Sequence, residues 1–315
     1  MPEGISEAEF TKTIRKFDDF FREMSKVIVG QDDVLKQILA SMMCGGNALL
    51  ESYPGLGKTL MVRTIAAILD LKFARVQNTP DLLPSDIIGT YIIEEQAGKK
   101  VFKFQPGPIF ANIILADEIN RATPKTQSAL LEAMQERQIT VGTETFRLDL
   151  PFYVLATQNP IDQEGTYPLP EAQIDRFLFK IMLTYPSNDQ EMEIVERYAS
   201  SSDIGELKKV MDRTDMMRLQ ELTRMVPISN DLKNYTVQVV TKTRQSKNIE
   251  YGASPRASIG LILASKANAL LNKRNYVTKK DIQEMAFPVL RHRIVLSFKA
   301  EKEGIKPDDA IKELL

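Results

Sequence analysis

Glycines followed by lysine and threonine form a segment suited to binding a phosphate group. The segment is Ser52-Tyr-Pro-Gly-Leu-Gly-Lys-Thr59, and the residues from Leu60 onward place apolar side chains at helical spacing. Backbone N–H groups of such a loop converge on phosphate oxygens, because glycine adopts the required dihedrals and the next helix adds positive potential at its N-terminus. The usual pattern has glycine where this chain has Ser52. A plain helix start after a Pro-Gly turn is therefore the alternative.

Two adjacent carboxylates follow the apolar run Ile113–Ala116. In a nucleotide site, Lys58 is expected to bridge the β- and γ-phosphates and Thr59 to hold magnesium. Side chains of adjacent strand residues point to opposite faces, so Asp117 and Glu118 cannot do the same work. We expect Asp117 to contact the magnesium shell through water and Glu118 to polarise an attacking water. A solvated acidic strand end is the alternative, but the pair together with the loop favours nucleotide hydrolysis.

Three further polar residues are candidates for the same chemistry. Asn159 ends an apolar run and is expected to orient the attacking water if that strand neighbours the one ending in Asp117; otherwise it is a turn residue before Pro160. Arg176 directly precedes the last apolar run. Arg256 lies in the first turn of a predicted helix, where the helix dipole disfavours a cation by about 0.3–1 kcal/mol. This position predicts an anionic partner, which is either a carboxylate or a γ-phosphate.

A parallel sheet covered by helices would bring these side chains together. Short apolar runs alternate with helical patterns between residues 25 and 185, as expected for an α/β fold. Strands are expected at Asn47–Ser52, Lys72–Gln77, Asn112–Asp117, Phe152–Asn159 and Phe177–Thr184. Ile113–Ala116 is apolar at every position, which predicts a central strand buried on both faces. Ligands bind beyond the carboxyl ends of such strands, where the loop and the carboxylates would lie.

Two inserts and a helical C-terminal part complete the predicted organisation. Alternating patterns predict β-hairpins within Thr79–Phe104, with a turn at Gln96-Ala-Gly98, and within Gln138–Leu150. After Pro186 the β-branched runs stop, and helices are expected at about 189–201, 214–226, 231–246, 255–273 and 278–290. We therefore expect an α/β domain over residues 1–186 and a smaller helical domain over 187–315.

The composition excludes several other kinds of chemistry. The chain has 315 residues, 43% of them hydrophobic and 26% charged, with a net charge of −1. A single cysteine, Cys44, and a single histidine, His292, exclude disulfides, Cys/His zinc sites and Cys–His catalysis. His292, within Arg291-His-Arg293, is expected to pack or to lie at the surface. Without an apolar run of about 18 residues or a signal-peptide core, we expect a cytoplasmic protein with no membrane span.

Six segments together resemble the MoxR family of AAA+ ATPases, in the branch that includes magnesium chelatase subunits and replicative helicases. The resemblance covers roughly residues 5 to 315, and in MoxR-like proteins the residue at the Ser52 position varies. The matching segments are Val27–Gln31, the phosphate loop, Pro80–Asp86, Asp117–Gln127, Leu130–Glu136 and Leu169–Phe177. The implied fold is an AAA+ P-loop core with a five-stranded parallel sheet and an all-α C-terminal lid. The implied inserts are a helix-2 insert at about 79–108 and a pre-sensor 1 hairpin at about 138–150.

The resemblance also implies ligands and roles. The ligands are ATP and Mg²⁺. The residues bordering adenine would be Val29, Gly30 and Gln31, and those of the phosphate loop Pro54, Gly55, Leu56, Gly57, Lys58, Thr59 and Leu60. Asn159 would be sensor 1, and Arg256 would be sensor 2, reaching the γ-phosphate from the helical lid. Arg176 would be the arginine finger, inserted into the neighbouring subunit's site.

An arginine finger supplied by a neighbour implies a homo-oligomeric ring, expected to be a hexamer. The family implies an ATP-driven remodelling chaperone that acts on a protein client or metal-insertion partner, often one with a von Willebrand factor type A domain. A nucleic-acid motor of the same branch is the alternative, because Lys99-Lys-Val-Phe-Lys103 gives one hairpin a basic, aromatic tip. The near-zero net charge and the absence of tryptophan disfavour nucleic acid. A nucleotide-switched scaffold with little turnover is a third possibility, disfavoured because every catalytic position is filled.

Overall fold

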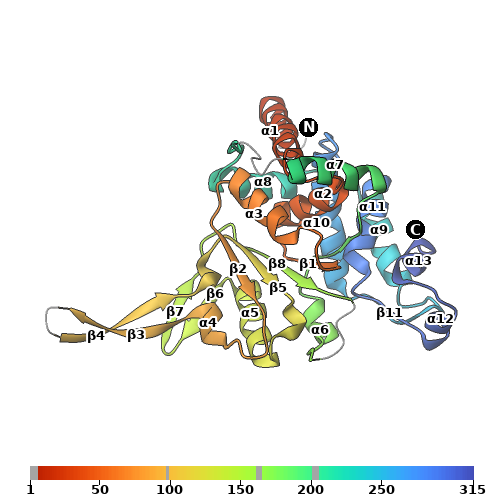
Figure 1. Cartoon of the computed structure of the whole chain (residues 1–315). Helices are drawn as coiled ribbons and strands as arrows, with labels where there is room; N and C mark the ends of the chain where they lie inside the picture. Colours follow the sequence, from red (N-terminus) through yellow and green to blue (C-terminus); the bar gives the residue numbers. More distant parts are fainter. Residues whose placement is uncertain (1–5, 97–98, 161–164, 201–205) are drawn as a thin grey trace.

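A parallel five-stranded sheet forms the centre of the structure. The computed structural model describes residues 6–96, 99–160, 165–200 and 206–315 (Figure 1). The strand order is β2-β5-β8-β1-β9. Their bounds are β1 (Ala48–Ser52), β2 (Phe73–Gln77), β5 (Ile113–Asp117), β8 (Tyr153–Gln158) and β9 (Phe179–Leu183). All five predicted strands are present, and each lies within one or two residues of its predicted bounds.

The strand β5 is buried at all five positions, as its continuous apolar run predicts. Its alternate residues enter two different cores: Ile113 and Leu115 face one, whereas Ile114 and Ala116 face the other. The middle of the sheet is nevertheless β8, which pairs with β5 on one side and with β1 on the other. Burial on both faces therefore indicated an interior strand but not the central one.

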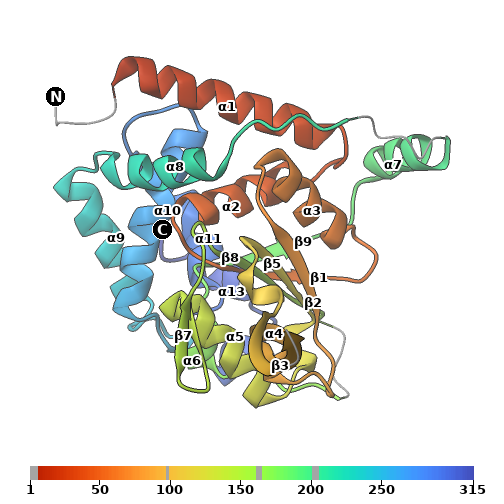
Figure 2. The same ribbon diagram turned by 90° about the vertical axis from the view of Figure 1, so that its left-hand side faces the viewer.

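Helices cover both faces of the sheet. The first core collects side chains from α1 (Glu7–Ser25), α2 (Asp32–Met43) and α3 (Lys58–Ile68). The second core includes α5 (Pro124–Glu136), and two single-turn 3₁₀ helices, η1 (Pro108–Phe110) and η2 (Ile119–Arg121), flank β5. Figure 2 shows α1, α2 and α3 on one side of the strands and α4 and α5 on the other.

Both predicted hairpins are present. The first insert contains α4 (Pro84–Ile88) and the antiparallel pair β3 (Gly89–Gln96) and β4 (Lys99–Pro106), and the second contains β6 (Gln138–Val141) and β7 (Glu144–Arg147). Residues 97 and 98 of the first predicted turn lie outside the described residues. The β3–β4 hairpin projects away from the body of the molecule on the side of β2 (Figure 1). Its base is anchored where a ring stack joins Phe104 to Phe146, with centroids 4.2 Å apart.

The C-terminal part is helical, with one short ladder that the sequence did not predict. Its elements are α7 (Asn188–Ser200), α8 (Arg213–Met225), α9 (Asn230–Lys242), β10 (Ile249–Tyr251), α10 (Pro255–Leu271), α11 (Lys279–Leu290), β11 (Val295–Leu296), α12 (Phe298–Lys302) and α13 (Pro307–Lys312). The short helix α6 (Glu171–Ile174) precedes β9 and belongs to the α/β part. The five predicted helices correspond to α7 to α11, and α9 ends four residues before its predicted end. Among the described residues, none of the helices combines the length and the apolar character needed to cross a bilayer.

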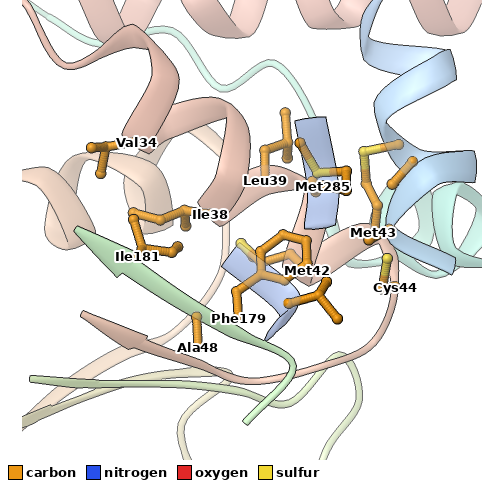
Figure 3. Close-up of a cluster of buried hydrophobic side chains, with 14 of the residues drawn as sticks. Val34, Ile38, Leu39, Met42, Met43, Cys44, Ala48, Phe179, Ile181 and Met285 are labelled. Atoms are coloured by element: carbon orange, nitrogen blue, oxygen red, sulfur yellow. The ribbon is translucent and has the colours of Figure 1, made fainter. Parts of the chain in front are cut away.

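The C-terminal helices share one apolar core with the sheet. Figure 3 shows Met285 of α11 beside Phe179 of β9 and Met42 of α2. Helix α10 likewise contacts α2, and α11 contacts β9. The predicted division of the chain at residue 186 stays a prediction, and the packing across it is continuous.

Candidate nucleotide site

The loop after β1 has an open, glycine-dependent shape. Gly55 and Gly57 have φ of +82° and +71°, and α3 begins immediately afterwards at Lys58. Among the described residues, and apart from each glycine and its two neighbours in the chain, no atom lies within 4 Å of a Cβ built on either glycine. Left-handed dihedrals at these two positions aim successive N–H groups toward the open side at a helix N-terminus, which is an arrangement that binds anions.

A cavity of about 430 Å³ adjoins this loop. Seven of the residues predicted to bind nucleotide line it: Val29, Gln31, Pro54, Gly55, Leu56, Gly57 and Leu60. Gly30, between two lining residues in the chain, has φ of +72°, and a Cβ there would meet Cδ of Gln190 at 2.3 Å. The structure therefore brings the two predicted segments together, and the assignment of the cavity to adenine stays a prediction.

Helix α7 forms a wall of the cavity that the sequence did not reveal. Its residues Ile194 and Tyr198 line the space, together with Tyr185 before the helix. The Tyr198 hydroxyl donates a 2.6 Å hydrogen bond to the carbonyl oxygen of Val27, which ties α7 to the opposite wall. The spacing of apolar residues in α7 indicated a helix, but nothing in it indicated which cavity the helix covers.

The two acidic residues occupy different environments at the end of β5. Asp117 is 6% exposed, and its Oδ2 accepts hydrogen bonds from Nη2 of Arg75 at 2.7 Å and from Nε at 3.3 Å. Its Oδ1 accepts a 2.7 Å bond from the hydroxyl of Thr157. Glu118 has φ of +55°, and its backbone N–H donates to the same Thr157 oxygen at 2.9 Å. A left-handed non-glycine residue costs about 1–3 kcal/mol, so Thr157 stabilises a strained conformation of Glu118.

The carboxylate of Glu118 and the amide of Asn159 lie at the same sheet edge as the loop. Oε2 of Glu118 accepts bonds from Nε2 of Gln77 at 3.1 Å and from Nη1 of Arg121 at 3.2 Å. Asn159 directly follows β8, and β8 lies between β5 and β1. The condition on which its predicted role depended is therefore met, and that role stays a prediction.

Arg75, Gln77 and Thr157 also belong to the site, although none of them was a candidate on sequence grounds. Arg75 and Gln77 alternate along β2, and this strand pairs in parallel with β5 so that Gln77 lies opposite Asp117. An Arg-x-Gln pattern in a strand next to an acidic strand end is a usable signal, because alternation places both side chains on one face. Thr157 lies within the predicted fourth strand, but only the strand order reveals that it adjoins Asp117.

Asp117 and Thr59 suit magnesium, since carboxylate and hydroxyl oxygens are ligands that this ion prefers. The Asp117 carboxylate has roughly four acceptor positions, and the three hydrogen bonds above leave about one for a water of the ion's shell. Thr59 lies one residue into α3, on the loop side of the sheet. The donor set therefore fits Mg²⁺ held by Thr59 and, through water, by Asp117.

Arg176 and Arg256 lie together, away from the loop. Both line a small pocket of about 110 Å³ with Asn47, and Nη1 of Arg256 contacts Oδ2 of Asp175 at 3.0 Å. The adjoining segment pairs with the start of β1, because the N–H of Leu178 donates to the carbonyl of Asn47 at 2.8 Å.

The prediction that Arg256 reaches the γ-phosphate from the helical lid stays a prediction; within one chain, Arg256 lies at the opposite edge of the sheet from the phosphate loop. The phosphate loop follows the end of β1, and the five residues of this strand separate the two edges by about 15 Å. The anion that compensates Arg256 within the chain is the carboxylate of Asp175.

Comparisons with known proteins agree with this geometry. Residues 47–179 match the family model described as "ATPase family associated with various cellular activities (AAA)", and residues 241–314 match the AAA lid domain. Chaperone MoxR1 of Mycobacterium tuberculosis is 45% identical over 302 residues, which cover 93% of this chain and 79% of that protein. The chain belongs to the MoxR family of AAA+ ATPases.

A second relative and a solved structure show the same extended similarity. The uncharacterized protein YeaC of Bacillus subtilis is 46% identical over 292 residues, covering 93% of this chain and 91% of that one. The crystal structure of a putative ATPase from Cytophaga hutchinsonii superimposes with a TM-score of 0.89 at 44% identity. It covers 96% of this chain and 95% of that chain. The AAA+ core with a helical lid is therefore the fold of this MoxR-family chain.

Proposed function

We propose that this chain hydrolyses ATP to ADP and phosphate with Mg²⁺. The supporting observation is that the phosphate loop lies at the same sheet edge as Asp117 and Glu118, both of which are hydrogen-bonded to Thr157, beyond the carboxyl ends of β1 and β5. Lys58 would bind the β- and γ-phosphates, and Thr59 and Asp117 would hold the ion, which would neutralise charge that develops on the phosphates. Glu118 would polarise the attacking water, and Asn159 would orient it.

The site is proposed to be completed by a second copy of the chain. Arg176 is exposed and lies at the opposite edge of the sheet from its own loop, with Arg256 beside it. We propose that both arginines enter the neighbouring subunit's site, so that Arg256 acts as a second cation in trans. An arginine finger contributes ~10³ to 10⁵ in rate, which corresponds to about 4–7 kcal/mol of barrier. Hydrolysis would then require assembly into a ring, proposed to be a hexamer in the cytoplasm.

The β3–β4 hairpin is the proposed contact with a protein client. Ile93 and Phe102 pair across its strands and are 61% and 72% exposed. Exposed apolar side chains on a projecting ribbon are typical of surfaces that bind other proteins. We propose that the ring is a remodelling chaperone that applies this hairpin to a protein, with a von Willebrand factor type A domain protein as partner.

A nucleic-acid motor is the second candidate, since three lysines lie near the hairpin tip. Their charge is largely balanced: Nζ of Lys103 contacts Oε2 of Glu94 at 2.9 Å, and Lys100 lies opposite Glu95. Balanced charge is poorly suited to a phosphate backbone. Single-stranded DNA that stimulates turnover in a salt-dependent manner, with the effect lost on changing Lys99 and Lys100 to Glu, would favour this candidate.

Mixing two inactive variants tests the shared site. Arg176→Ala should lack the finger but keep its own loop, and Glu118→Gln should keep the finger but hydrolyse ATP far more slowly. We expect each to be inactive alone and their mixture to regain part of the wild-type phosphate release. Full inactivity of mixtures that co-assemble would contradict the proposal. Pull-down with Glu118→Gln in ATP would then retain the client longest.

A further inference from the structure

Arg293, which lies between α11 and β11, binds the segment that carries Arg176. Arg293 is 9% exposed, and its Nε donates to Oδ1 of Asp175 at 2.7 Å. Nη1 and Nη2 donate to main-chain carbonyl oxygens on both sides of Arg176 and to one in α11. These bonds join Nη2 to Asp175 at 3.1 Å and to Phe177 at 2.5 Å, and Nη1 to Leu178 at 2.9 Å and to Val289.

The neighbouring histidine contacts the same segment. Nε2 of His292 lies 3.0 Å from the carbonyl oxygen of Phe177. Burial and the adjacent Arg293 hold the pKa of His292 well below its ordinary value, so the ring is neutral. Because a carbonyl only accepts, the proton lies on Nε2 and this nitrogen donates. Nδ1 is buried without a hydrogen-bond partner among the described residues, so the ring is held here at the expense of one unsatisfied acceptor.

Asp175 connects this anchor to the second arginine of the shared edge. Its Oδ1 accepts from Arg293, and its Oδ2 accepts from Nη1 of Arg256 at 3.0 Å. Arg293 follows α11, and Arg256 is the second residue of α10. Two lid elements therefore meet at the carboxylate of Asp175, the residue before Arg176. The Arg176 side chain itself is exposed.

We propose that Arg293 is a positioning residue for the neighbour's ATP site: through Asp175 it fixes Arg176 and Arg256 relative to each other and joins them to the lid. This inference rests on the proposed function in trans. A planar guanidinium binds one carboxylate and several carbonyls at once, which a lysine ammonium cannot do in the same geometry. Groups that act on a transition state need such support, because a misplacement of about 1 Å can cost ~10² in rate.

The experiment uses the mixture of Arg176→Ala and Glu118→Gln subunits and adds one further change to one subunit at a time. The two resulting mixtures are the two arms of the experiment. Arg293→Lys is placed either in the Glu118→Gln subunit, which supplies the fingers, or in the Arg176→Ala subunit, which supplies the working site. We expect recovered phosphate release to fall ~10- to 100-fold in the first arm and to stay unchanged in the second. A purely structural role would lower both arms alike, because both subunits carry the same folding defect.

A control and a second variant keep the result interpretable. Arg274→Lys alters another arginine paired with a buried aspartate, at the far end of α10, and should leave both arms unchanged. If Arg293→Lys fails to assemble, Asp175→Asn, at a 23% exposed side chain, should produce the same difference between the arms. Equal effects in both arms, or none in the first, would overturn the inference alone. Failure of the parent mixture to recover activity would overturn the proposed shared site as well.

Discussion

The hydroxyl of Thr157 donates a 2.7 Å hydrogen bond to Oδ1 of Asp117 and, with the same oxygen, accepts the backbone N–H of Glu118. One buried side chain therefore fixes both acidic residues of the site, although their own side chains diverge. The hydroxyl suits this position because it is donor and acceptor at once. A residue of β8 thereby sets the geometry at the end of β5.

Thr157→Val should reduce ATP turnover by about 10- to 100-fold while changing ATP affinity only a few-fold. Valine keeps the shape but leaves Oδ1 of Asp117 and the N–H of Glu118 without this partner, which also costs about 1–3 kcal/mol of stability. Phosphate release and calorimetric titration with ATP measure the two effects. Thr157→Ser, which retains the hydroxyl, should stay within a few-fold of wild type. Near-normal turnover in the valine variant would refute the role given to Thr157.

Lys58→Ala should abolish ATP binding, because it removes the charge placed at the N-terminus of α3 beside the two left-handed glycines. Calorimetry with ATP and with ADP measures the loss. Lys36→Ala, at an exposed position of α2, is the matched control and should bind as wild type does. Unchanged affinity in the Lys58 variant would remove the loop from the site.

Arg256→Ala should act only on a neighbour. Placed in the Glu118→Gln subunit of the complementing mixture, it should lower recovered turnover at least ~10-fold; placed in the Arg176→Ala subunit, it should have no effect. The reason is the separation of about 15 Å between the two edges of the sheet. Loss of discrimination between ATP and ADP in the dissociated subunit would instead indicate contact with its own nucleotide.

Phe102→Ser combined with Ile93→Ser should abolish client retention and leave basal ATP hydrolysis and thermal stability near wild type. Both side chains are largely exposed, so few native contacts are lost. Pull-down in the Glu118→Gln background measures retention. Val237→Ser, an equally polar change at an exposed position of α9, is the control. Undiminished capture by the double variant would exclude the hairpin from the contact.

Asp281→Asn should destabilise the lid by about 3 kcal/mol at pH 7, because it leaves Arg274 partly buried without its charge partner. Burial raises the pKa of Asp281, but hydrogen bonds from Arg274 and Thr278 outweigh it, and the net pKa lies below its ordinary value. A lowered folded-state pKa contributes stability that is present above the unfolded value of about 3.9 and is lost as pH falls through the folded value.

Urea unfolding from pH 7 to pH 3 checks this expectation. The difference between wild type and Asp281→Asn should be constant above about pH 5 and should shrink below about pH 4. Glu303→Gln, in an exposed pair with Lys299, should change stability by less than about 0.5 kcal/mol throughout. A pH-independent difference would show that the charge of Asp281 is not what stabilises the pair.

The sequence predicted local features well and spatial relationships less well. Periodicity located β5 and α10, because buried strands and capped helices leave local patterns. It did not locate the Arg75–Asp117 contact or the Thr157 bridge, since both depend on strand order and register. The position of Arg256 in a first helical turn predicted an anionic partner, but only the position of the lid identifies that partner within the chain as Asp175.

The shared core of α2, β9 and α11 limits how this protein can be divided. A fragment ending after β9 would uncover apolar side chains that face α11, such as Leu39 and Phe179, and we expect such a surface to promote aggregation. The AAA segment and the lid segment are thus separate sequence matches, but we expect that they cannot be produced as separate stable fragments. Any swing of the C-terminal helices large enough to open this seam would amount to local unfolding, so each subunit should move as a single rigid piece against its neighbours.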